Sequence, residues 1–161
     1  IEAAGGVPEM CRVGHSFVKA EMRKKGAIFA GELSGHFYFR DFWRADSGML
    51  AALHTLAALG GEPAGTSLSS MLASYERYAS SGEINTTVAD QETTMAAVED
   101  AFDGRSGVTL DHMDGLTVEH RDWWFNLRAS NTEPLLRLNA EAADRATMET
   151  VRDEVLGIVA G

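Results

Sequence analysis

Cysteine, proline and long apolar runs are all scarce in this sequence of 161 residues. Its one cysteine, Cys11, excludes an internal disulfide framework and fits a reducing compartment, so we expect a cytoplasmic protein. No apolar run approaches the roughly 20 residues that a membrane span needs, so we expect no membrane partner. The first residues, I-E-A-A-G-G-V-P, lack the basic and apolar regions of a signal peptide and look like the end of a helix. We therefore expect a chain that begins inside a domain.

Basic residues are scarce in the second half of the chain. Residues 1–82 carry eight acidic and eight basic side chains, whereas residues 83–161 carry sixteen acidic and only six basic ones. Such an acidic surface repels the nucleic-acid backbone, so we expect no nucleic-acid partner. Any anion site in this half must be built locally from arginines and backbone N–H groups, which draws attention to Arg128 and Arg137.

Several motifs of phosphate and metal chemistry are also missing. The sequence has neither G-x-x-x-x-G-K-[ST] nor G-x-G-x-x-G, and no serine has a convincing activating partner. The acids of D-F-W-R-A-D-S at 41–47 are too loosely placed to hold magnesium, and D-H-M-D-G at 111–115 is better explained as a hairpin turn. We expect no metal ligands in this chain.

The first half alternates helical and extended patterns, which is typical of an α/β layer. A charge change and the cluster Ser80-Ser81-Gly82 mark the end of a further helix that opens at Ser67. We therefore predict a first domain at 1–66, a connecting helix at 67–82 and a second domain at 83–161. The predicted elements before the connecting helix are a helix at 16–25, strands at 27–30 and 36–40, and a helix from Asp46 or Ser47 to Leu59.

The second half has clearer strand patterns. Apolar residues alternate with polar ones through 123–128 and 135–141, which predicts two strands with one buried face. Asp90 and Asp144 are expected to cap two helices. The remaining strands are predicted at 84–88, 108–112 and 116–120, the last two forming a hairpin around Asp114-Gly115. This pattern favours a largely antiparallel sheet with both helices on one face.

The loop at 129–134 joins the last two strands and combines several groups that bind phosphate. Arg128 can contact phosphate in a bidentate manner, and Asn131 tolerates the backbone angles of an anion-binding nest. A hairpin loop in which serine and asparagine only satisfy the turn is the alternative. An arginine at each end, in so acidic a half, favours a phosphate site. The candidate residues are Arg128, Ser130, Asn131, Thr132 and Arg137.

A second polar loop, G-E-L-S-G-H at 31–36, lies far upstream. Glu32 and Ser34 can bind vicinal hydroxyls, and His36 can donate or exchange a proton near neutral pH. Arg12 and His15 form another basic pair beside Gly14. Each group alone could equally be a strand-connecting turn or a surface pair. Together with the phosphate loop, they suggest one ligand, a phosphorylated sugar.

Three stretches carry a resemblance to a known family. In this order, V-G-H-S-F-V-K, G-E-L-S-G-H and R-A-S-N-T-E-P-L-L-R resemble the C-terminal part of the phosphohexomutases, nearest to phosphomannomutase/phosphoglucomutase. The resemblance covers nearly the whole chain. It implies an α/β and α+β protein, in which the end of an incomplete α/β third domain is followed by a fourth domain that resembles the TATA-binding-protein fold.

The resemblance also implies an activity and the role of each loop. Members interconvert hexose 6-phosphate and hexose 1-phosphate by reversible phosphoryl transfer from a phosphoserine, with Mg²⁺ as cofactor. Glu32 and Ser34 would hold the sugar O3 and O4, and the loop after Arg128 would hold the unreactive phosphate. Arg12 and His15 would line the cleft, with His15 as a catalytic acid/base group.

Two departures from the family pattern limit this reading. The phosphoserine loop and the aspartate-rich magnesium loop are missing here, so we expect a fragment that is inactive alone and that works with the remaining domains of its enzyme. A non-catalytic sugar-phosphate-binding or protein-docking module is the alternative class. Phosphoglucosamine mutase is an alternative within the family, although Leu33, Ala129 and Asn131 favour the mannose/glucose branch.

Overall fold

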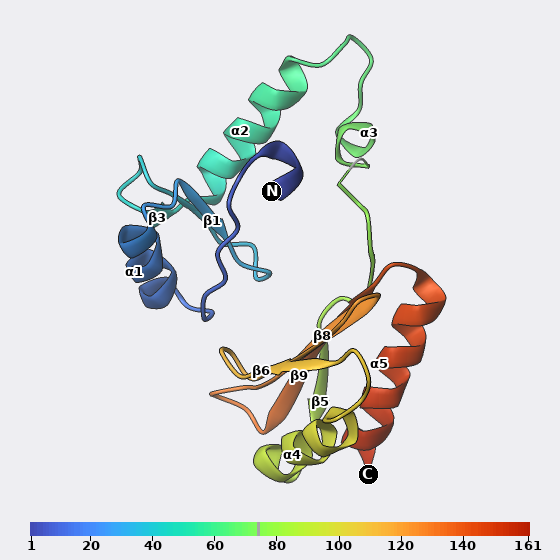
Figure 1. The fold of residues 1–161 in the computed structure, drawn as a ribbon. Coiled ribbons are helices and arrows are strands. Elements are labelled where there is room, and N and C mark those ends of the chain that lie inside the picture. The colour runs from blue at the N-terminus through green and yellow to red at the C-terminus, as the bar shows by residue number, and fades with distance from the viewer. Residues whose placement is uncertain (74) are drawn as a thin grey trace. The chain divides into compact units, whose positions relative to one another are not determined.

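The computed structural model describes residues 1–73 and 75–161, and Figure 1 shows its fold. The chain divides into two compact units, Ile1–Ser74 and Tyr75–Gly161. Within the described residues, no helix is both long enough and apolar enough to cross a membrane. The architecture is mixed α/β with antiparallel sheets, as the sequence predicts.

The first unit is a small three-stranded sheet with helices around it. Its strands pair antiparallel in the order β1-β2-β3, and Ser47 caps α2 by accepting a hydrogen bond from the Leu50 N–H at 3.2 Å. The strand β3 was not expected from the sequence. The elements are a 3₁₀ turn η1 (Glu2–Ala4), α1 (His15–Lys25), β1 (Phe29–Gly31), β2 (Phe37–Phe39), β3 (Ala45–Asp46), α2 (Gly48–Gly60) and α3 (Leu68–Leu72).

The core of this unit is thin. Val18 and Met22 of α1 and Tyr38 of β2 are its buried residues, and Cys11 is packed against them as a small half-buried group. The helix α2 has no buried residue, and its Met49, Leu53 and Leu56 are exposed. Little apolar area therefore supports the loops of this unit.

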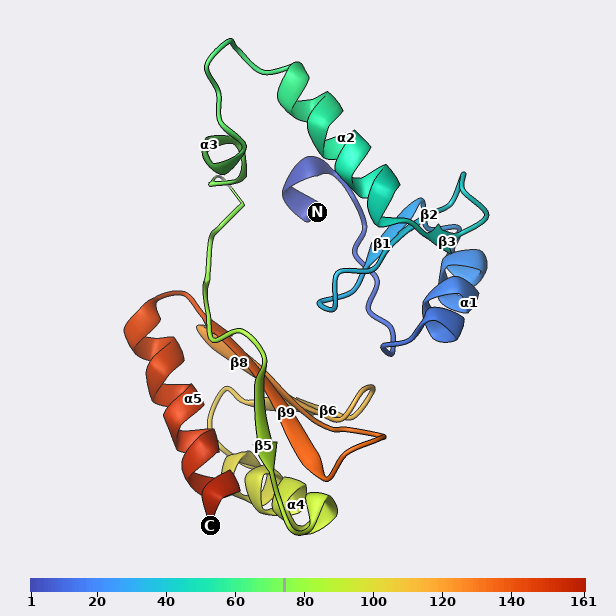
Figure 2. The ribbon, with the colours of Figure 1, turned by 180° about the vertical axis from the view of Figure 1, so that it is seen from behind.

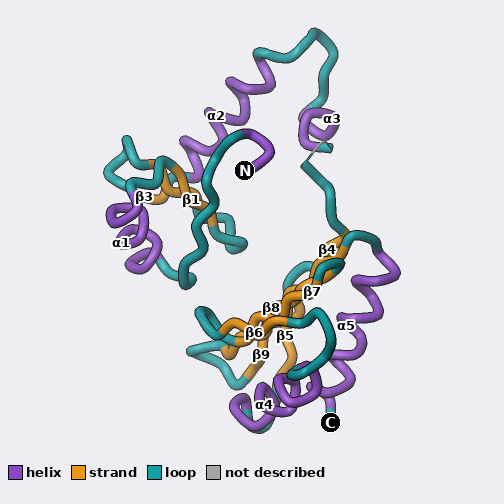
Figure 3. The backbone as a smooth tube through the Cα atoms, in the orientation of Figure 1, coloured by secondary structure: helices purple, strands orange, loops and turns teal. Residues whose placement is uncertain are grey.

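The second unit is a six-stranded antiparallel sheet (Figure 3), which confirms the predicted sheet type. The strand order is β4-β9-β8-β7-β6, and β5 also pairs with β9. Asp90 and Asp144 cap the two helices as expected, by accepting from the N–H groups of Thr93 and Thr147. The elements are β4 (Ala79–Ser80), β5 (Ile84–Thr87), α4 (Gln91–Phe102), β6 (Thr109–Asp111), β7 (Leu116–His120), β8 (Trp123–Ala129), β9 (Leu135–Ala142) and α5 (Arg145–Ala160).

One face of this sheet carries the core, and α4 and α5 cover it (Figure 2). The alternation predicted for β8 and β9 is confirmed, because inward residues such as Phe125 and Leu138 are buried while Arg137 is half-buried. The Phe102 ring of α4 meets the Phe125 ring edge-on, with 4.9 Å between ring centroids. The sheet is therefore a rigid platform from which the β8–β9 loop projects.

The connecting helix expected at 67–82 is wrong in length. Ser67 opens a helix with a capping box, but α3 ends at Leu72, and Ala79–Ser80 forms the strand β4. Sheet pairing explains the difference, since β4 pairs with Ala142 and Glu141 of β9. Tyr75 and Tyr78, which fall within the expected helix range, are exposed, and Ser74 lies outside the described residues.

Candidate functional site

The polar loop predicted at 31–36 is a tight turn between β1 and β2. The Gly35 N–H donates to the Glu32 carbonyl at 2.9 Å, and the Glu32 N–H donates to the His36 carbonyl at 2.9 Å. Gly35 adopts φ 83°, a left-handed conformation that glycine takes without strain. The turn leaves Ser34 exposed at its tip and Glu32 and His36 half-buried at its base.

A buried tyrosine, Tyr38, holds the carboxylate of Glu32. Its hydroxyl donates to Glu32 Oε1 at 2.5 Å. Burial raises the pKa of Tyr38, and the Glu32 carboxylate raises it further, so the phenol remains a donor. Sequence reasoning missed Tyr38, whose only signal was its place in the strand directly after the loop. The second oxygen of Glu32 can accept from a ligand hydroxyl.

An aspartate on the neighbouring strand, Asp46, holds His36. The His36 Nδ1 lies 2.7 Å from Asp46 Oδ2, and Asp46 Oδ1 accepts from the Phe37 N–H at 2.9 Å. The hydrogen bond with His36, followed by the one from Phe37, lowers the pKa of Asp46, which keeps it ionised. Sequence reasoning treated Asp46 as a candidate helix cap and as one of two acids too loosely placed to hold magnesium. It missed the contact with His36, because β3, which brings Asp46 beside Tyr38, has no sequence signal of its own.

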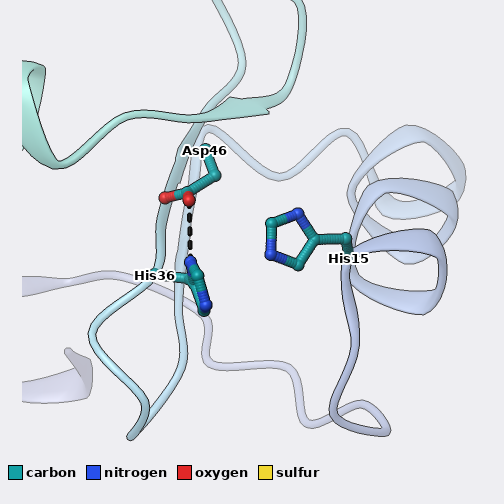
Figure 4. Close-up of side chains that lie close together, drawn as sticks. All are labelled: His15, His36 and Asp46. Carbon is teal, nitrogen blue, oxygen red and sulfur yellow. Dashed lines mark hydrogen bonds and ion pairs between the residues drawn. The ribbon is translucent and has the colours of Figure 1, made fainter.

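The predicted catalytic residue, His15, lies beside these groups (Figure 4). It begins α1, and its ring packs edge-on against His36, with 4.6 Å between ring centroids, and against Tyr38 at 5.3 Å. Arg12 is exposed and places its guanidinium over the Phe17 ring, 4.7 Å from the centroid. The fold therefore gathers His15 with the loop. Among the described residues, Arg12 has no hydrogen bond or ion pair to the loop.

The predicted phosphate loop, after β8, is closed by its own backbone. The Ser130 N–H donates to the Leu135 carbonyl at 2.9 Å, and the Thr132 N–H lies 3.4 Å from Ser130 Oγ. Ser130 is buried, whereas Asn131 and Thr132 are exposed. The loop thus presents an amide side chain and a hydroxyl to solvent above a fixed serine.

A glutamine, Gln91, supports the same loop from below. Its Nε2 at the start of α4 lies 3.2, 3.1 and 2.8 Å from the carbonyl oxygens of Ser130, Glu133 and Leu135. These contacts satisfy backbone acceptors that would otherwise leave the loop free to move. Sequence reasoning missed Gln91, since no local pattern links it to a loop about 40 residues away.

The two arginines of the site differ in their surroundings. Arg128 and Arg137 are direct partners across β8 and β9, so their like charges repel unless each is paired. Arg128 lies 3.5 Å from a carboxylate oxygen of Asp114, and Arg137 lies 2.9 Å from one of Glu83. Glu83 precedes β5, whose Ile84 pairs with Leu138, so Arg137 turns away from the loop. Arg128 is the arginine better placed for a loop-bound anion.

A hairpin turn at 111–115, predicted as a turn from its Asp-Gly sequence, packs against Arg128. Gly115 has φ 76°, and a Cβ there would lie 2.6 Å from the Leu127 carbonyl oxygen and 3.1 Å from the Arg128 Cβ. The Asn126 side chain also donates to the Asp114 carbonyl at 2.8 Å. The turn is therefore fixed beside the guanidinium that Asp114 pairs with.

Comparison with known families assigns each unit. The phosphoglucomutase/phosphomannomutase alpha/beta/alpha domain III matches residues 1–78, and the phosphoglucomutase/phosphomannomutase C-terminal domain matches residues 83–158. Together these matches cover almost the whole chain, including both polar loops.

Individual relatives agree with the family matches. The chain is 43% identical to phosphohexose mutases of Xanthomonas campestris pv. campestris, covering 100% of this chain and 36% of the relative. It is 42% identical to the phosphomannomutase of Methanocaldococcus jannaschii, covering 99% of this chain and 34% of the relative. A crystal structure of a phosphoglucomutase/phosphomannomutase family protein from Burkholderia thailandensis matches with a TM-score of 0.78 and 31% identity, covering 98% of this chain and 33% of that one.

The matched relatives are much longer than this chain. The chain spans about a third of the length of these relatives. The matched domains and the identity over the whole chain show that this protein belongs to the phosphoglucomutase/phosphomannomutase family of phosphohexomutases.

Proposed function

We propose that this chain is the substrate-recognising part of a mutase that interconverts hexose 6-phosphate and hexose 1-phosphate through a phosphoserine and a hexose bisphosphate. The proposal rests mainly on one observation: each matched family domain carries a polar loop that is already ordered by its own contacts. Phosphoryl transfer depends chiefly on positioning and on charge stabilisation, which ordered loops supply. The antiparallel sheet with two helices on one face also supports our proposal of a TATA-binding-protein-like fold for the second unit.

Each loop has a separate role in this proposal. Glu32 and Ser34 bind the sugar O3 and O4, which mannose and glucose present in the same way. Arg128 and the hydroxyl and amide groups of residues 130–132 bind the phosphate that is not reacting. The ligand turns over between the two half-reactions, so the same groups must accept both isomers.

His36 is our candidate for proton transfer, with His15 beside it. Asp46 holds Nδ1 of His36 at 2.7 Å, which fixes the orientation of the ring. His15, the acid/base group expected from the sequence, is exposed and has no carboxylate at hydrogen-bond distance among the described residues. This arrangement favours His36 as the proton acceptor and His15 as a neighbour that lines the site.

The remaining chemistry is assigned to other domains. Among the described residues, three metal-ligating side chains gather only at His15, His36 and Asp46, and two imidazoles do not suit Mg²⁺, which prefers oxygen ligands. The residues present therefore do not fit the family's Mg²⁺. We propose that the chain alone does not turn over hexose phosphate, and that its partners are the other domains of a cytoplasmic enzyme.

A docking module is the second candidate function. The exposed apolar residues of α2 favour it, since such residues are common at protein contacts. An assay of phosphomannomutase activity distinguishes the two candidates once this chain is joined to domains that carry a phosphoserine loop. Turnover supports the mutase, and a ligand-independent complex without turnover supports the docking module.

Titration of tryptophan fluorescence with mannose 1-phosphate tests the binding proposal, with free mannose and inorganic phosphate as controls. Trp123 and Trp124 lie on β8, which leads into Arg128, so they report on this loop. Arg128→Ala removes a charged hydrogen-bond donor and should weaken binding by about 1.5–3 kcal/mol. Arg121→Ala, an arginine that is 91% exposed, is the matched control and should bind as the parent does. Equal binding by the Arg128 variant and the parent would show that the phosphate site is misassigned.

A further inference from the structure

Three metal-ligating side chains meet at one end of the first unit's sheet. One ligand atom each from His15, His36 and Asp46 lies within 4.8 Å of the other two. Figure 4 shows that both imidazoles and the carboxylate turn toward a common space from three separate elements, the start of α1, the β1–β2 turn and β3. The fold, rather than a short sequence motif, creates this cluster.

The donor set decides which ions could bind. Two imidazole nitrogens and one carboxylate oxygen suit divalent transition ions such as Zn²⁺ and Co²⁺, whereas Mg²⁺ and Ca²⁺ prefer oxygen ligands alone. Zinc commonly takes three protein ligands and keeps one position open. The cluster matches that pattern, since it offers three ligands and His15 is exposed to solvent.

The distances require two small movements. Ligands at about 2.0–2.2 Å from a tetrahedral ion lie roughly 3.3 Å apart, so separations of up to 4.8 Å must shrink by at most about 1.5 Å. His15 can supply this movement by side-chain rotation, because it is exposed and begins its helix. His36 Nδ1 and Asp46 Oδ2 are 2.7 Å apart, so they must separate by about 0.6 Å to take the ion between them. The one proton that they share then moves to Nε2 of His36.

The carboxylate is already oriented as ligating carboxylates are. Asp46 Oδ1 accepts from the Phe37 N–H at 2.9 Å, so Oδ2 is left toward the two histidines. Outer hydrogen bonds of this kind fix the direction of a metal ligand and raise affinity.

We propose that His15, His36 and Asp46 form a binding site for a divalent transition metal ion, and that the bound ion blocks the sugar loop. The second part rests on the proposed function, in which His36 serves the sugar. An ion on the nitrogen of His36 that faces Asp46 fixes the ring and leaves the proton on Nε2. The ring can then no longer accept a hydrogen bond or a proton from a sugar hydroxyl.

The first experiment measures metal binding alone. The 161-residue chain is titrated with Zn²⁺ by calorimetry and with Co²⁺ by visible absorption, with Mg²⁺ as the comparison ion. We expect one Zn²⁺ per chain, cobalt bands of nitrogen and oxygen ligation that Zn²⁺ abolishes, and no heat with Mg²⁺. His15→Ala, His36→Ala and Asp46→Asn should each weaken Zn²⁺ binding at least about 10-fold.

A matched control separates this site from other histidines. His112 is an exposed histidine 3.3 Å from Glu99 in the second unit, so His112→Ala removes a comparable His–carboxylate pair. This variant should bind Zn²⁺ as the parent does. If His36→Ala or Asp46→Asn folds poorly, His15→Ala remains the decisive variant, because His15 is exposed and its removal should not disturb the fold. Unchanged Zn²⁺ affinity in His15→Ala, or a loss in His112→Ala, overturns the metal site.

Competition then separates the two parts of the proposal. In the mannose 1-phosphate titration, saturating Zn²⁺ should weaken sugar-phosphate binding to the parent but not to His15→Ala. Zn²⁺ binding without competition would overturn the blocking role while the metal site stands. Sugar-phosphate binding that His36→Ala leaves unchanged would overturn the assigned role of His36 in the proposed function, whatever the outcome with zinc.

Discussion

The two units support their polar loops in different ways. Among the residues that the structure describes, thirteen buried ones form the core beneath the sheet of the second unit, whereas three form the core of the first. The phosphate loop therefore stands on a packed platform, with Gln91 beneath it. The sugar loop depends instead on a few polar contacts, chiefly those of Tyr38 with Glu32 and of Asp46 with His36. Apolar packing fixes one loop, and hydrogen bonds fix the other.

This contrast has a consequence for stability. Full burial of one large apolar side chain stabilises a fold by about 1.5–3 kcal/mol, so the second unit gains far more from packing than the first. Hydrogen bonds contribute less each, about 0.5–1.5 kcal/mol net. We expect the second unit to resist denaturant after the first has opened, and each variant below tests one side of this difference.

The largest effect should come from Phe102→Ala. Phe102 is fully buried, and its ring meets Phe125 at 4.9 Å and Trp123 at 5.9 Å between centroids. Its removal leaves a cavity and should destabilise the second unit by about 3–5 kcal/mol. Urea unfolding in a Trp43→Phe background, where the fluorescence comes from Trp123 and Trp124 of the second unit, measures this loss. Leu53→Ala on the exposed side of α2 is the control, and a similar loss there would refute the contrast between the two cores.

Gly115→Ala should have the next largest effect. Its φ of 76° strains an alanine, and the added Cβ would lie 2.6 Å from the Leu127 carbonyl oxygen, so the hairpin must move. We expect a loss of about 1–3 kcal/mol in unfolding free energy.

Gly104→Ala is the matched control for this change. Gly104 has φ 71°, but nothing lies within 4 Å of its added Cβ, so it carries the backbone strain without the contact. The difference between the two variants, measured by urea unfolding, isolates the close approach of hairpin and strand. Equal losses would mean that only backbone strain matters at Gly115.

Features that depend on neighbouring residues could be predicted from the sequence. The caps at Asp90 and Asp144, the alternation in β8 and β9, and the Asp-Gly turn are set by interactions a few residues apart. The two loops were found for the same reason, since glycines and polar residues mark turns wherever they occur.

Features that depend on distant residues could not be predicted. Gln91 reaches the loop carbonyls across about 40 residues, and Asp46 meets His36 only because β3 pairs with β2. The connecting helix is shorter than its apolar pattern predicts, because pairing with β9 draws Ala79 and Ser80 into the sheet. In each case the local sequence is compatible with more than one structure, and a contact with a residue far away along the chain determines which one forms.

Tyr38→Phe tests the polar support of the first unit. The change removes the donor to Glu32 and should lower the stability of this unit by about 0.5–1.5 kcal/mol, with weaker sugar-phosphate binding. Because the pKa of Tyr38 is raised in the fold, its stabilising contribution is complete below the unfolded pKa of about 10 and declines as pH rises above it. Hydrogen exchange of the β1 and β2 amides measures the loss.

The pH dependence provides a second check on the same contact. Between pH 8 and about pH 11 the parent should lose more stability than Tyr38→Phe, since only the parent has the buried phenol. Tyr78→Phe, at a tyrosine that is 67% exposed, should keep the parent's profile. A parallel decline in the parent and the Tyr38 variant would show that the hydroxyl does not support the first unit.

The smallest effect should come from the helix caps, which differ in charge between the units. Asp144 accepts from the Thr147 N–H at 2.9 Å and from its hydroxyl at 2.8 Å, and these bonds lower the pKa of Asp144. Its contribution is therefore present above the unfolded pKa of about 3.9 and lost as pH falls through the lower folded value. In the first unit, the uncharged Ser47 caps α2 with one bond at 3.2 Å, so its contribution does not titrate.

Substitution of each cap by alanine tests this difference between a charged and an uncharged cap. Asp144→Ala should unfold at a lower temperature than the parent near neutral pH. This difference in unfolding temperature should narrow as pH falls below about 3.9, the unfolded pKa, and the parent's carboxylate takes up a proton. Ser47→Ala should unfold at a slightly lower temperature than the parent, and this difference should not vary with pH, because the serine hydroxyl stays neutral throughout. Thermal unfolding followed by circular dichroism measures both differences. If the difference in unfolding temperature between Asp144→Ala and the parent does not change with pH, the charge of Asp144 does not contribute to the cap. The negative charge at the start of α5 would then add no stability to the second unit.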